Sequence, residues 1–379
     1  MRLRVGIIGL GDTWERRYRP ALLTLRDRFD VRSVYSPVTL LADKAARRFR
    51  ADVSHGFQHL AHRTDIDAVL VLATDWLGIQ PILAACRAGK AVYGAGAFDL
   101  DMDQAAVLRQ RVRESGIAYM AEFPRRHAPA TVRLKELIAT RLGQPRLLFC
   151  HHRAKGGKSR SKRRQTSLSA NDSHRLANLV DWCCYVVGAA PHSVLGIEHP
   201  SAAARTSPAA SGQRQDPPPT GDSPVADYRL VSLDFSPEGA SGSGPIAQVS
   251  FGSYLLPDWP EAISFRPPAH LQVCCEHGVA FVDLPATVVW FDQAGPHLES
   301  LEHERPVGEQ MLRQFHRAVT SLILQRDDLE DACRITRIMR SLQQSVQQRC
   351  WLTVDQRPSE IPNDPPATQD DPKETTDAI

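Results

Sequence analysis

The sequence predicts an α/β protein with a doubly wound parallel sheet, followed by an α+β domain with an open, mostly antiparallel sheet. Before residue 123, short apolar runs rich in valine and isoleucine alternate with helical patterns. After that point, most strand patterns follow one another without helices between them. Apolar strands joined by helices indicate βαβ units in a covered parallel sheet, whereas consecutive strands indicate an antiparallel sheet.

Length and composition fit a globular protein of two domains. The chain has 379 residues, and a domain takes roughly 100–200 residues. Hydrophobic residues make up 42% and charged residues 23%, which excludes a disordered chain and a coiled-coil rod. The net charge of +3 gives no overall basic surface, so nucleic acid is not an expected partner. No apolar run approaches the roughly 18 residues of a membrane span, so no membrane partner is expected.

The cysteines and the N-terminus favour a cytoplasmic protein. The apolar stretch Val5–Leu10 is too short for a signal peptide. Most of the eight cysteines lie in apolar stretches, and none forms a C-x-x-C pair. Reduced core thiols explain this pattern better than a disulfide framework or a zinc site, so we expect no metal centre.

The first domain, residues 1–122, contains five apolar runs that predict its strands. These runs are Arg4–Gly9, Val31–Tyr35, Ala68–Ala73, Ala91–Tyr93 and Ile117–Ala121. Apolar residues at helical spacing, as in Pro81–Ala88 and Gln104–Val112, predict helices between them. Right-handed crossovers then give the sheet of a Rossmann domain.

The second domain, residues 123–355, is predicted to combine helices with many strands. The predicted helices are Thr131–Ile138, Leu176–Val187, Glu309–Leu324 and Asp328–Gln347. The predicted strands are Pro145–His151, Tyr228–Phe235, Ile246–Tyr254, His270–Cys275, Val279–Leu284 and Thr287–Phe291. Residues 200–224 read as a flexible insertion and residues 356–379 as a disordered tail, because both are polar and rich in proline.

A glycine turn after the first strand indicates a dinucleotide site. Gly9 allows a tight turn, and Gly11 lets the backbone approach a pyrophosphate, whereas Trp14 replaces the third glycine of the motif. We expect Asp12, Trp14 and Thr74 to lie against the cofactor as well. The alternative is an ordinary strand-to-helix turn.

The end of the second strand bears on the choice of cofactor. An acid usually stands there to bind the ribose 2′-hydroxyl, but this chain has Ser36. Serine does not repel a 2′-phosphate, and Lys44, Arg47 and Arg48 follow near the same edge. The sequence therefore favours NADP(H) over NAD(H), although a solvated basic helix face would look the same.

From Leu3 to about Val354, outside residues 200–224, the order of these motifs resembles the Gfo/Idh/MocA family of oxidoreductases. The resemblance rests on Val5–Gly11, Arg19–Leu22, Asp65–Thr74, Ala84–Lys90, Phe123–Arg126, Leu134–Pro145 and Cys274–Val282. It implies a Rossmann domain and hydride transfer between nicotinamide and a sugar, polyol or similar small molecule. It also implies that the second sheet could serve a homo-oligomer.

The sequence departs from the family where catalysis is expected. The resemblance places Gly96 at the position of the family's lysine, and Ala95 and Ala97 flank it, so no ammonium remains there. His174 stands at the position of the family's aspartate and Asn178 at that of its histidine. Histidine can exchange a proton near neutral pH, so His174 is a candidate acid or base and Asn178 a candidate hydrogen-bond donor. Alternatively, this is a helix start without a role in the reaction, capped by Asp172 or Ser173.

Two basic features lie near this segment. Arg125, at the domain boundary, could hold the nicotinamide end of the cofactor or an acidic substrate group, unless it is only part of a hinge turn. The basic run at 153–164 could cover an anionic substrate or the cofactor phosphates, although a solvated loop is the simpler explanation. The run has no aromatic residue to stack on bases, which argues against nucleic acid.

Two classes of function therefore remain. The first is an NAD(P)-dependent oxidoreductase with altered catalytic groups, because the cofactor itself supplies the hydride. The second is a non-catalytic nucleotide- or sugar-binding homologue, such as a sensor or a complex subunit. Joint loss of the lysine, aspartate and histidine favours the second class, and fold analogy cannot decide between them.

Overall fold

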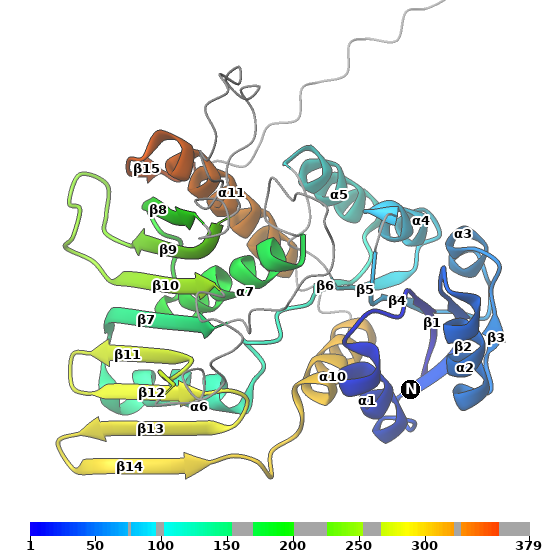
Figure 1. Ribbon diagram of the computed structural model, residues 1–379. Coiled ribbons are helices and arrows are strands. Elements are labelled where there is room, and N and C mark those ends of the chain that lie inside the picture. Colours follow the sequence, from blue (N-terminus) through cyan, green and yellow to red (C-terminus); the bar gives the residue numbers. More distant parts are fainter. Residues whose placement is uncertain are drawn as a thin grey trace, which may run out of the picture.

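The computed structural model describes residues 1–74, 77–95, 102–153, 170–200, 226–252, 267–321 and 327–355. Two sheets organise these residues, and they lie side by side (Figure 1). The flexible insertion expected within 200–224 lies, apart from residue 200, outside the described residues, as does the tail expected at 356–379.

The first sheet has six parallel strands in the order β3-β2-β1-β4-β5-β6. The strands are β1 (Leu3–Ile8), β2 (Phe29–Tyr35), β3 (Asp52–Val53), β4 (Ala68–Val71), β5 (Ala91–Gly94) and β6 (Tyr119–Ala121). This order is that of the dinucleotide-binding Rossmann fold, so the predicted doubly wound sheet is confirmed. The sequence did not reveal β3, because its two residues are too few to show alternation.

Helices cover both faces of this sheet. They are the π-helical turn η1 (Trp14–Tyr18), α1 (Arg19–Thr24), α2 (Thr39–Phe49), α3 (Phe57–Ala61), α4 (Gln80–Arg87) and α5 (Met102–Ser115). Another helix, α10 (Val307–Thr320), comes from the second half of the chain and packs on α1 beside the first sheet (Figure 1). The rings of its buried Phe315 and of Tyr93 in β5 are 5.7 Å apart.

The second sheet has nine strands in the order β14-β13-β12-β11-β7-β10-β9-β8-β15. The central strands are β7 (Pro145–Arg153), β8 (Ser193–Pro200), β9 (Ala226–Asp234), β10 (Ile246–Gly252) and β11 (Leu271–Cys275). The remaining strands are β12 (Val279–Asp283), β13 (Thr287–Asp292), β14 (Gly295–Ser300) and β15 (Leu352–Thr353). Only the β7–β10 pair is parallel, so the mostly antiparallel prediction is confirmed.

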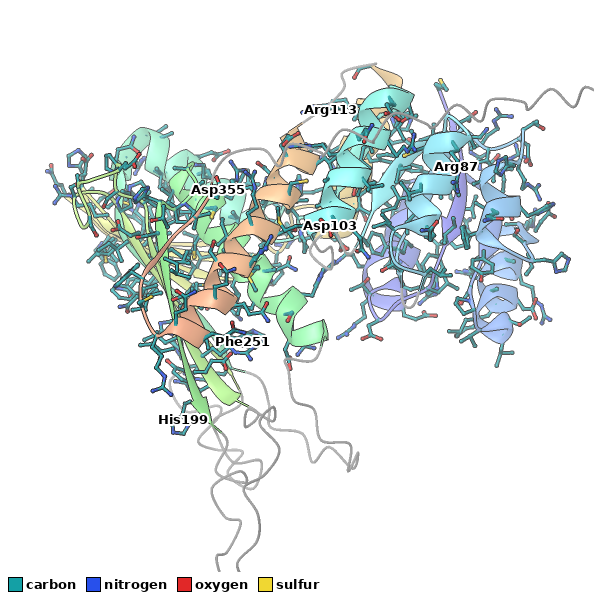
Figure 2. All side chains as sticks on the ribbon, turned by 90° about the horizontal axis from the view of Figure 1, so that it is seen from above. Arg87, Asp103, Arg113, His199, Phe251 and Asp355 are labelled. Atoms are coloured by element: carbon teal, nitrogen blue, oxygen red, sulfur yellow. The ribbon has the colours of Figure 1, made fainter. Side chains whose placement is uncertain are left out.

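Three helices accompany this sheet: α6 (Pro129–Leu137), α7 (Ala170–Val187) and α11 (Asp327–Gln348). Helix α11 contacts α5 and β6 on one side and α7 and β8 on the other. Figure 2 shows it between the second sheet and α5. Its apolar stripe joins a core that runs from the first sheet into the second. Among the described residues, no helix is long and apolar enough to cross a membrane.

Candidate functional site

The glycine turn after β1 is shaped by the end of β4. Gly9 has φ +78°, which favours glycine, and its amide donates a hydrogen bond of 2.9 Å to the Tyr35 carbonyl. A Cβ at Gly9 would lie 2.1 Å from the Ala73 carbonyl oxygen, and one at Gly11 would lie 3.1 Å from the Ala73 Cβ. The two glycines therefore let the turn approach the neighbouring strand closely, at the edge of the sheet where a dinucleotide binds in this fold.

The other residues expected at the turn have different surroundings. Trp14 is only 6% exposed, and its ring packs 6.0 Å from that of Phe49 in α2. Its side chain thus fills the core beside η1, a π-helical turn of a kind often found at functional sites. Asp12 is exposed, and Thr74 is half-buried with its carbonyl accepting a 2.8 Å hydrogen bond from the Leu77 amide.

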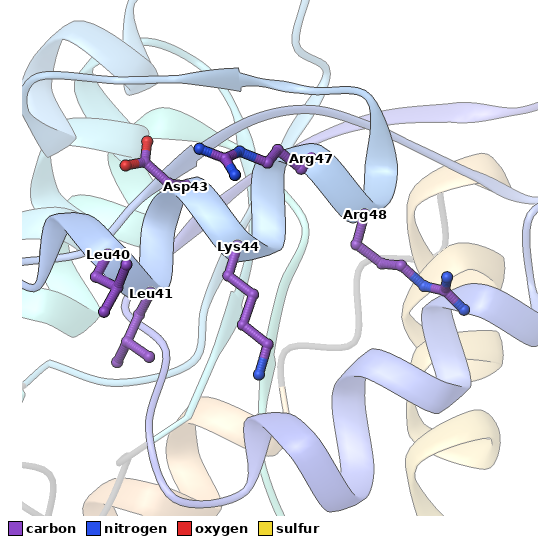
Figure 3. A pocket seen from close by; sticks show the side chains of 6 residues that line it. All are labelled: Leu40, Leu41, Asp43, Lys44, Arg47 and Arg48. Atoms are coloured by element: carbon purple, nitrogen blue, oxygen red, sulfur yellow. The ribbon is translucent and has the colours of Figure 1, made fainter.

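Ser36 lies at the end of β2, where the acid for the ribose was expected. It is 9% exposed, and its Oγ accepts a 3.3 Å hydrogen bond from the Val38 amide. Next to it, α2 borders a surface hollow of about 640 Å³ (Figure 3). The hollow is lined by Leu40, Leu41, Asp43, Lys44, Arg47 and Arg48. Lys44 Nζ lies 3.6 Å from the Glu15 carboxylate, so one of the three bases already has an anionic neighbour.

A buried polar group links the glycine turn to the end of β6. Arg17 in η1 forms an ion pair with Glu122, whose side chain is 8% exposed. Nearby, the hydroxyls of Tyr18 and Tyr93 are 3.1 Å apart, and burial raises the pKa of both tyrosines. Sequence analysis missed this group, although an acid directly after an apolar strand was a signal for Glu122.

The two arginines after β6 have different surroundings. Arg126 connects two helices inside the protein. Its Nε donates to Asp181 of α7 at 3.0 Å, and its Nη1 lies 2.5 Å from Asp331 of α11. Arg125 lies with its guanidinium carbon 5.7 Å from the centre of the Trp182 ring. Its Nε is buried without a hydrogen-bond partner, and burial lowers the pKa of this side chain.

The two candidate catalytic residues lie one turn apart on α7. Asn178 is 5% exposed, and its Nδ2 donates a 2.9 Å hydrogen bond to the His174 carbonyl. This bond uses one of the two side-chain N–H groups of Asn178, so only the other can donate a hydrogen bond to a substrate. His174 is half-buried. The expected capping role of Asp172 or Ser173 is wrong, because α7 begins earlier, at Ala170, and both residues lie inside its first turn.

His152, at the end of β7, is a residue that sequence analysis missed. Its ring stacks on Phe251 of β10, with ring centres 5.3 Å apart and an interplanar angle of 14°. Burial, together with the charges of Arg125 and Arg175, lowers its pKa to about 4, so the imidazole is neutral near pH 7. The available signal was a histidine pair, His151 and His152, at the end of an apolar strand.

Some expected site residues lie outside the described part of the chain. They are Gly96, which the resemblance places at the family's lysine position, with Ala97, and the basic run beyond Arg153. Ala95 is described: it is buried, and its amide donates a 2.8 Å hydrogen bond to the Val71 carbonyl. The strand pairing of β5 with β4 thus continues up to the residue before Gly96.

The first sheet and its glycine turn define a dinucleotide-binding Rossmann protein. Residues 3–94 match the model of the Gfo/Idh/MocA family, described as an oxidoreductase family with an NAD-binding Rossmann fold. The match confirms, over these residues, the resemblance seen in the sequence.

Similar proteins agree with this assignment. Over 136 residues the chain is 32% identical to dTDP-3,4-didehydro-2,6-dideoxy-alpha-D-glucose 3-reductase of Actinomadura kijaniata, covering 36% of this chain and 41% of that protein. The matches to curated relatives thus span about two fifths of those relatives' length.

Two solved structures share the fold over nearly the whole chain. Levoglucosan dehydrogenase, in complex with NADH and levoglucosan, matches with a TM-score of 0.71 and 16% identity, over 94% of this chain and all of that one. Aldose-aldose oxidoreductase from Caulobacter crescentus matches with a TM-score of 0.72 and 15% identity, over 93% and 100%.

Proposed function

We propose that the protein is an NAD(P)-dependent oxidoreductase that acts on a sugar, polyol or related small carbonyl compound with non-standard catalytic residues. The observation that carries the proposal is the glycine turn of the family-matched sheet, held against β4 at the dinucleotide edge. The names of similar proteins, a dTDP-sugar 3-reductase and levoglucosan dehydrogenase, support the substrate class.

In this proposal the chain's residues bind and orient, and the nicotinamide cofactor supplies or accepts the hydride. Gly9, Gly11 and Asp12 form the turn on which the pyrophosphate would lie. Trp14 fixes that turn through the core, and Thr74 lies in the segment that follows β4. His174 would exchange the proton of the substrate oxygen, and Asn178 would position the helix turn that carries His174.

Gly11→Asp should abolish binding of the dinucleotide. The new side chain would enter a space where a Cβ already lies 3.1 Å from the Ala73 Cβ, and its charge would repel the pyrophosphate. Titration of the unmodified protein and the variant with NADPH and NADH, followed by nicotinamide fluorescence, measures this. Asp27→Asn serves as the control, because this side chain is exposed in the turn before β2, away from the glycine turn. Equal binding by Gly11→Asp and the unmodified protein would refute the site.

We expect NADP(H) to bind more tightly than NAD(H). Ser36 carries no charge to repel a 2′-phosphate, and Arg47 and Arg48 line the hollow beside it. Arg48→Gln should weaken NADPH binding while leaving NADH binding within about twofold, because only NADPH carries the 2′-phosphate. Tenfold tighter binding of NADH, a difference of about 1.4 kcal/mol, would overturn the preference.

A non-catalytic nucleotide- or sugar-binding homologue is the second candidate, favoured by the replacement of the family's catalytic residues. Tight cofactor binding without turnover on a broad panel of sugars and carbonyl compounds would support this non-catalytic function over the oxidoreductase.

We further propose a division of the chain at residue 122, a cytoplasmic location, and a homo-oligomer formed through the second sheet. Eight free thiols, most of them buried, support the location. Exposed Leu147, Phe291 and Leu298 support the oligomer.

A further inference from the structure

Four strands of the second sheet align a row of side chains next to the candidate catalytic residues. Phe251 of β10 pairs with His152 of β7 and with Arg229 of β9, and Arg229 pairs in turn with Glu198 of β8. Residues directly opposite one another in neighbouring strands point to the same face of a sheet. Because Cys150, two residues before His152, is buried in the core that includes α7, this row lies on the face that α7 covers.

Arg229 in this row and Arg125, whose charge acts on His152 of the row, each have a nitrogen without a partner. The Arg125 Nε and the Arg229 Nη1 are buried and make no hydrogen bond. A buried N–H of a charged group that stays unbonded costs folding free energy, so such groups call for an explanation. The neighbouring Arg126, in contrast, pairs with the carboxylates of Asp181 and Asp331. The two adjacent arginines therefore differ in that Arg125 has no such partner in the part of the chain that the structure describes.

The carboxylates around the row are already engaged. Glu198 pairs with Arg229 through Nε, and Asp181 pairs with Arg126. Asp172 lies 3.8 Å from Arg175 near the start of α7. Among the described residues, no carboxylate forms an ion pair with Arg125. The positive charge of Arg125 is therefore not neutralised by a direct ion pair among these residues, and Arg125 is half-buried rather than closed off.

We propose that Arg125 and His152, supported by Arg229, bind an anionic group, the carboxylate or phosphate of an acidic sugar or polyol. The proposal rests on the proposed function only in taking this ligand to be the substrate. It assigns Arg125 to the substrate rather than to the nicotinamide end of the cofactor. Phe251, on which the His152 ring stacks, would contact the apolar side of the ligand. The other end of the ligand would reach the turn of α7 that carries His174.

The charges around His152 give this proposal a direct readout. Burial is the largest cause of the lowered pKa of His152. The charges of Arg125, Arg175 and His270 lower it further, and the charge of Asp172 raises it. An anion bound at Arg125 would compensate the positive charge that disfavours the imidazolium. The pKa of His152 should therefore rise from about 4 when the anion binds.

The experiment follows the His152 Cε1–H resonance by NMR during pH titrations, with the signal assigned through His152→Gln. Sodium sulfate and sodium D-glucuronate are the probes, and sodium chloride at equal ionic strength is the reference. D-Glucuronamide, which has the same sugar but no charge, is the matched neutral ligand. We expect sulfate, glucuronate or both to raise the titration midpoint by at least one pH unit, and glucuronamide to leave it unchanged. Sulfate and glucuronate separate a tetrahedral oxyanion from a carboxylate as the preferred group.

The variants test the arginine itself. Arg125→Gln should weaken anion binding at least tenfold, Arg125→Lys should recover part of it, and Arg111→Gln, on the exposed face of α5, should change nothing. The comparison of glucuronate with glucuronamide needs no variant, so it holds even if Arg125→Gln fails to fold. No anion effect beyond that of chloride, or an anion effect that persists in Arg125→Gln, would overturn the proposal. So would a tenfold loss of NADPH binding in Arg125→Gln with anion binding unchanged. Because the readout needs neither cofactor nor turnover, failure of the proposed oxidoreductase activity would leave it intact.

Discussion

Arg126→Met should lower the free energy of unfolding by about 3–5 kcal/mol, because it leaves a buried carboxylate unpaired. Arg126 joins Asp181 of α7 to Asp331 of α11, and Asp181 is 1% exposed. The Arg126 guanidinium also lies over the Phe123 ring, at 3.9 Å, so its removal disturbs packing as well. Urea unfolding followed by circular dichroism measures the loss.

The matched control for this variant is Arg133→Met. Arg133 pairs with Glu299, but the two side chains are 30% and 33% exposed. An ion pair in contact with solvent contributes about 0.2–1 kcal/mol, so this variant should remain close to the unmodified protein. Equal losses in the two variants would show that Arg126 does not hold α7 and α11 together.

His174→Ala should reduce turnover by about 10²–10⁴-fold, the usual contribution of a positioned acid or base, and leave cofactor affinity nearly unchanged. The reason is that Gly96 supplies no ammonium, which leaves His174 as the proposed acid or base. Steady-state kinetics on the best substrate of a sugar and carbonyl panel, with NADPH titration beside it, measures both quantities. His303→Ala, in an exposed turn, is the control.

The direction of the reaction adds a second criterion. Alcohol oxidation needs a proton acceptor beside the carbon that loses hydride, whereas water can deliver a proton during carbonyl reduction. Ordinary polyol oxidation should therefore be slow and carbonyl reduction faster. Robust polyol oxidation that His174→Ala does not affect would show that another residue holds the catalytic role.

The sequence predicted most of the fold, because burial on both faces leaves a clear pattern in parallel strands. β4 is a continuous apolar run, β1 is one apart from Arg4, and their predicted positions agree with the structure. The edge strands were missed for the opposite reason. β14 alternates between half-buried and exposed residues, and its sequence, Gly295–Ser300, carries little apolar signal.

The site was harder to predict, because its parts come together only in three dimensions. Gly9 could be found because one local backbone conformation requires glycine. His152 and Glu122 each had a local signal at the end of an apolar strand. Their roles could not be predicted, because these depend on contacts with Phe251 and Arg17, which are distant in the sequence. The contrast between Arg125 and Arg126 was equally invisible, since two adjacent arginines look alike until their partners are known.

The return of α10 to the first sheet has a consequence for recombination between homologues. A chimera joined only at residue 122 would bring α10 of one parent against the sheet of the other. Phe315 and Met311 would then meet an unfamiliar Tyr93 and α1. The part of the chain that has to be exchanged as one unit is therefore discontinuous, because it consists of the N-terminal sheet together with α10. Exchanging it requires three junctions, one after β6 and one on each side of Val307–Thr320.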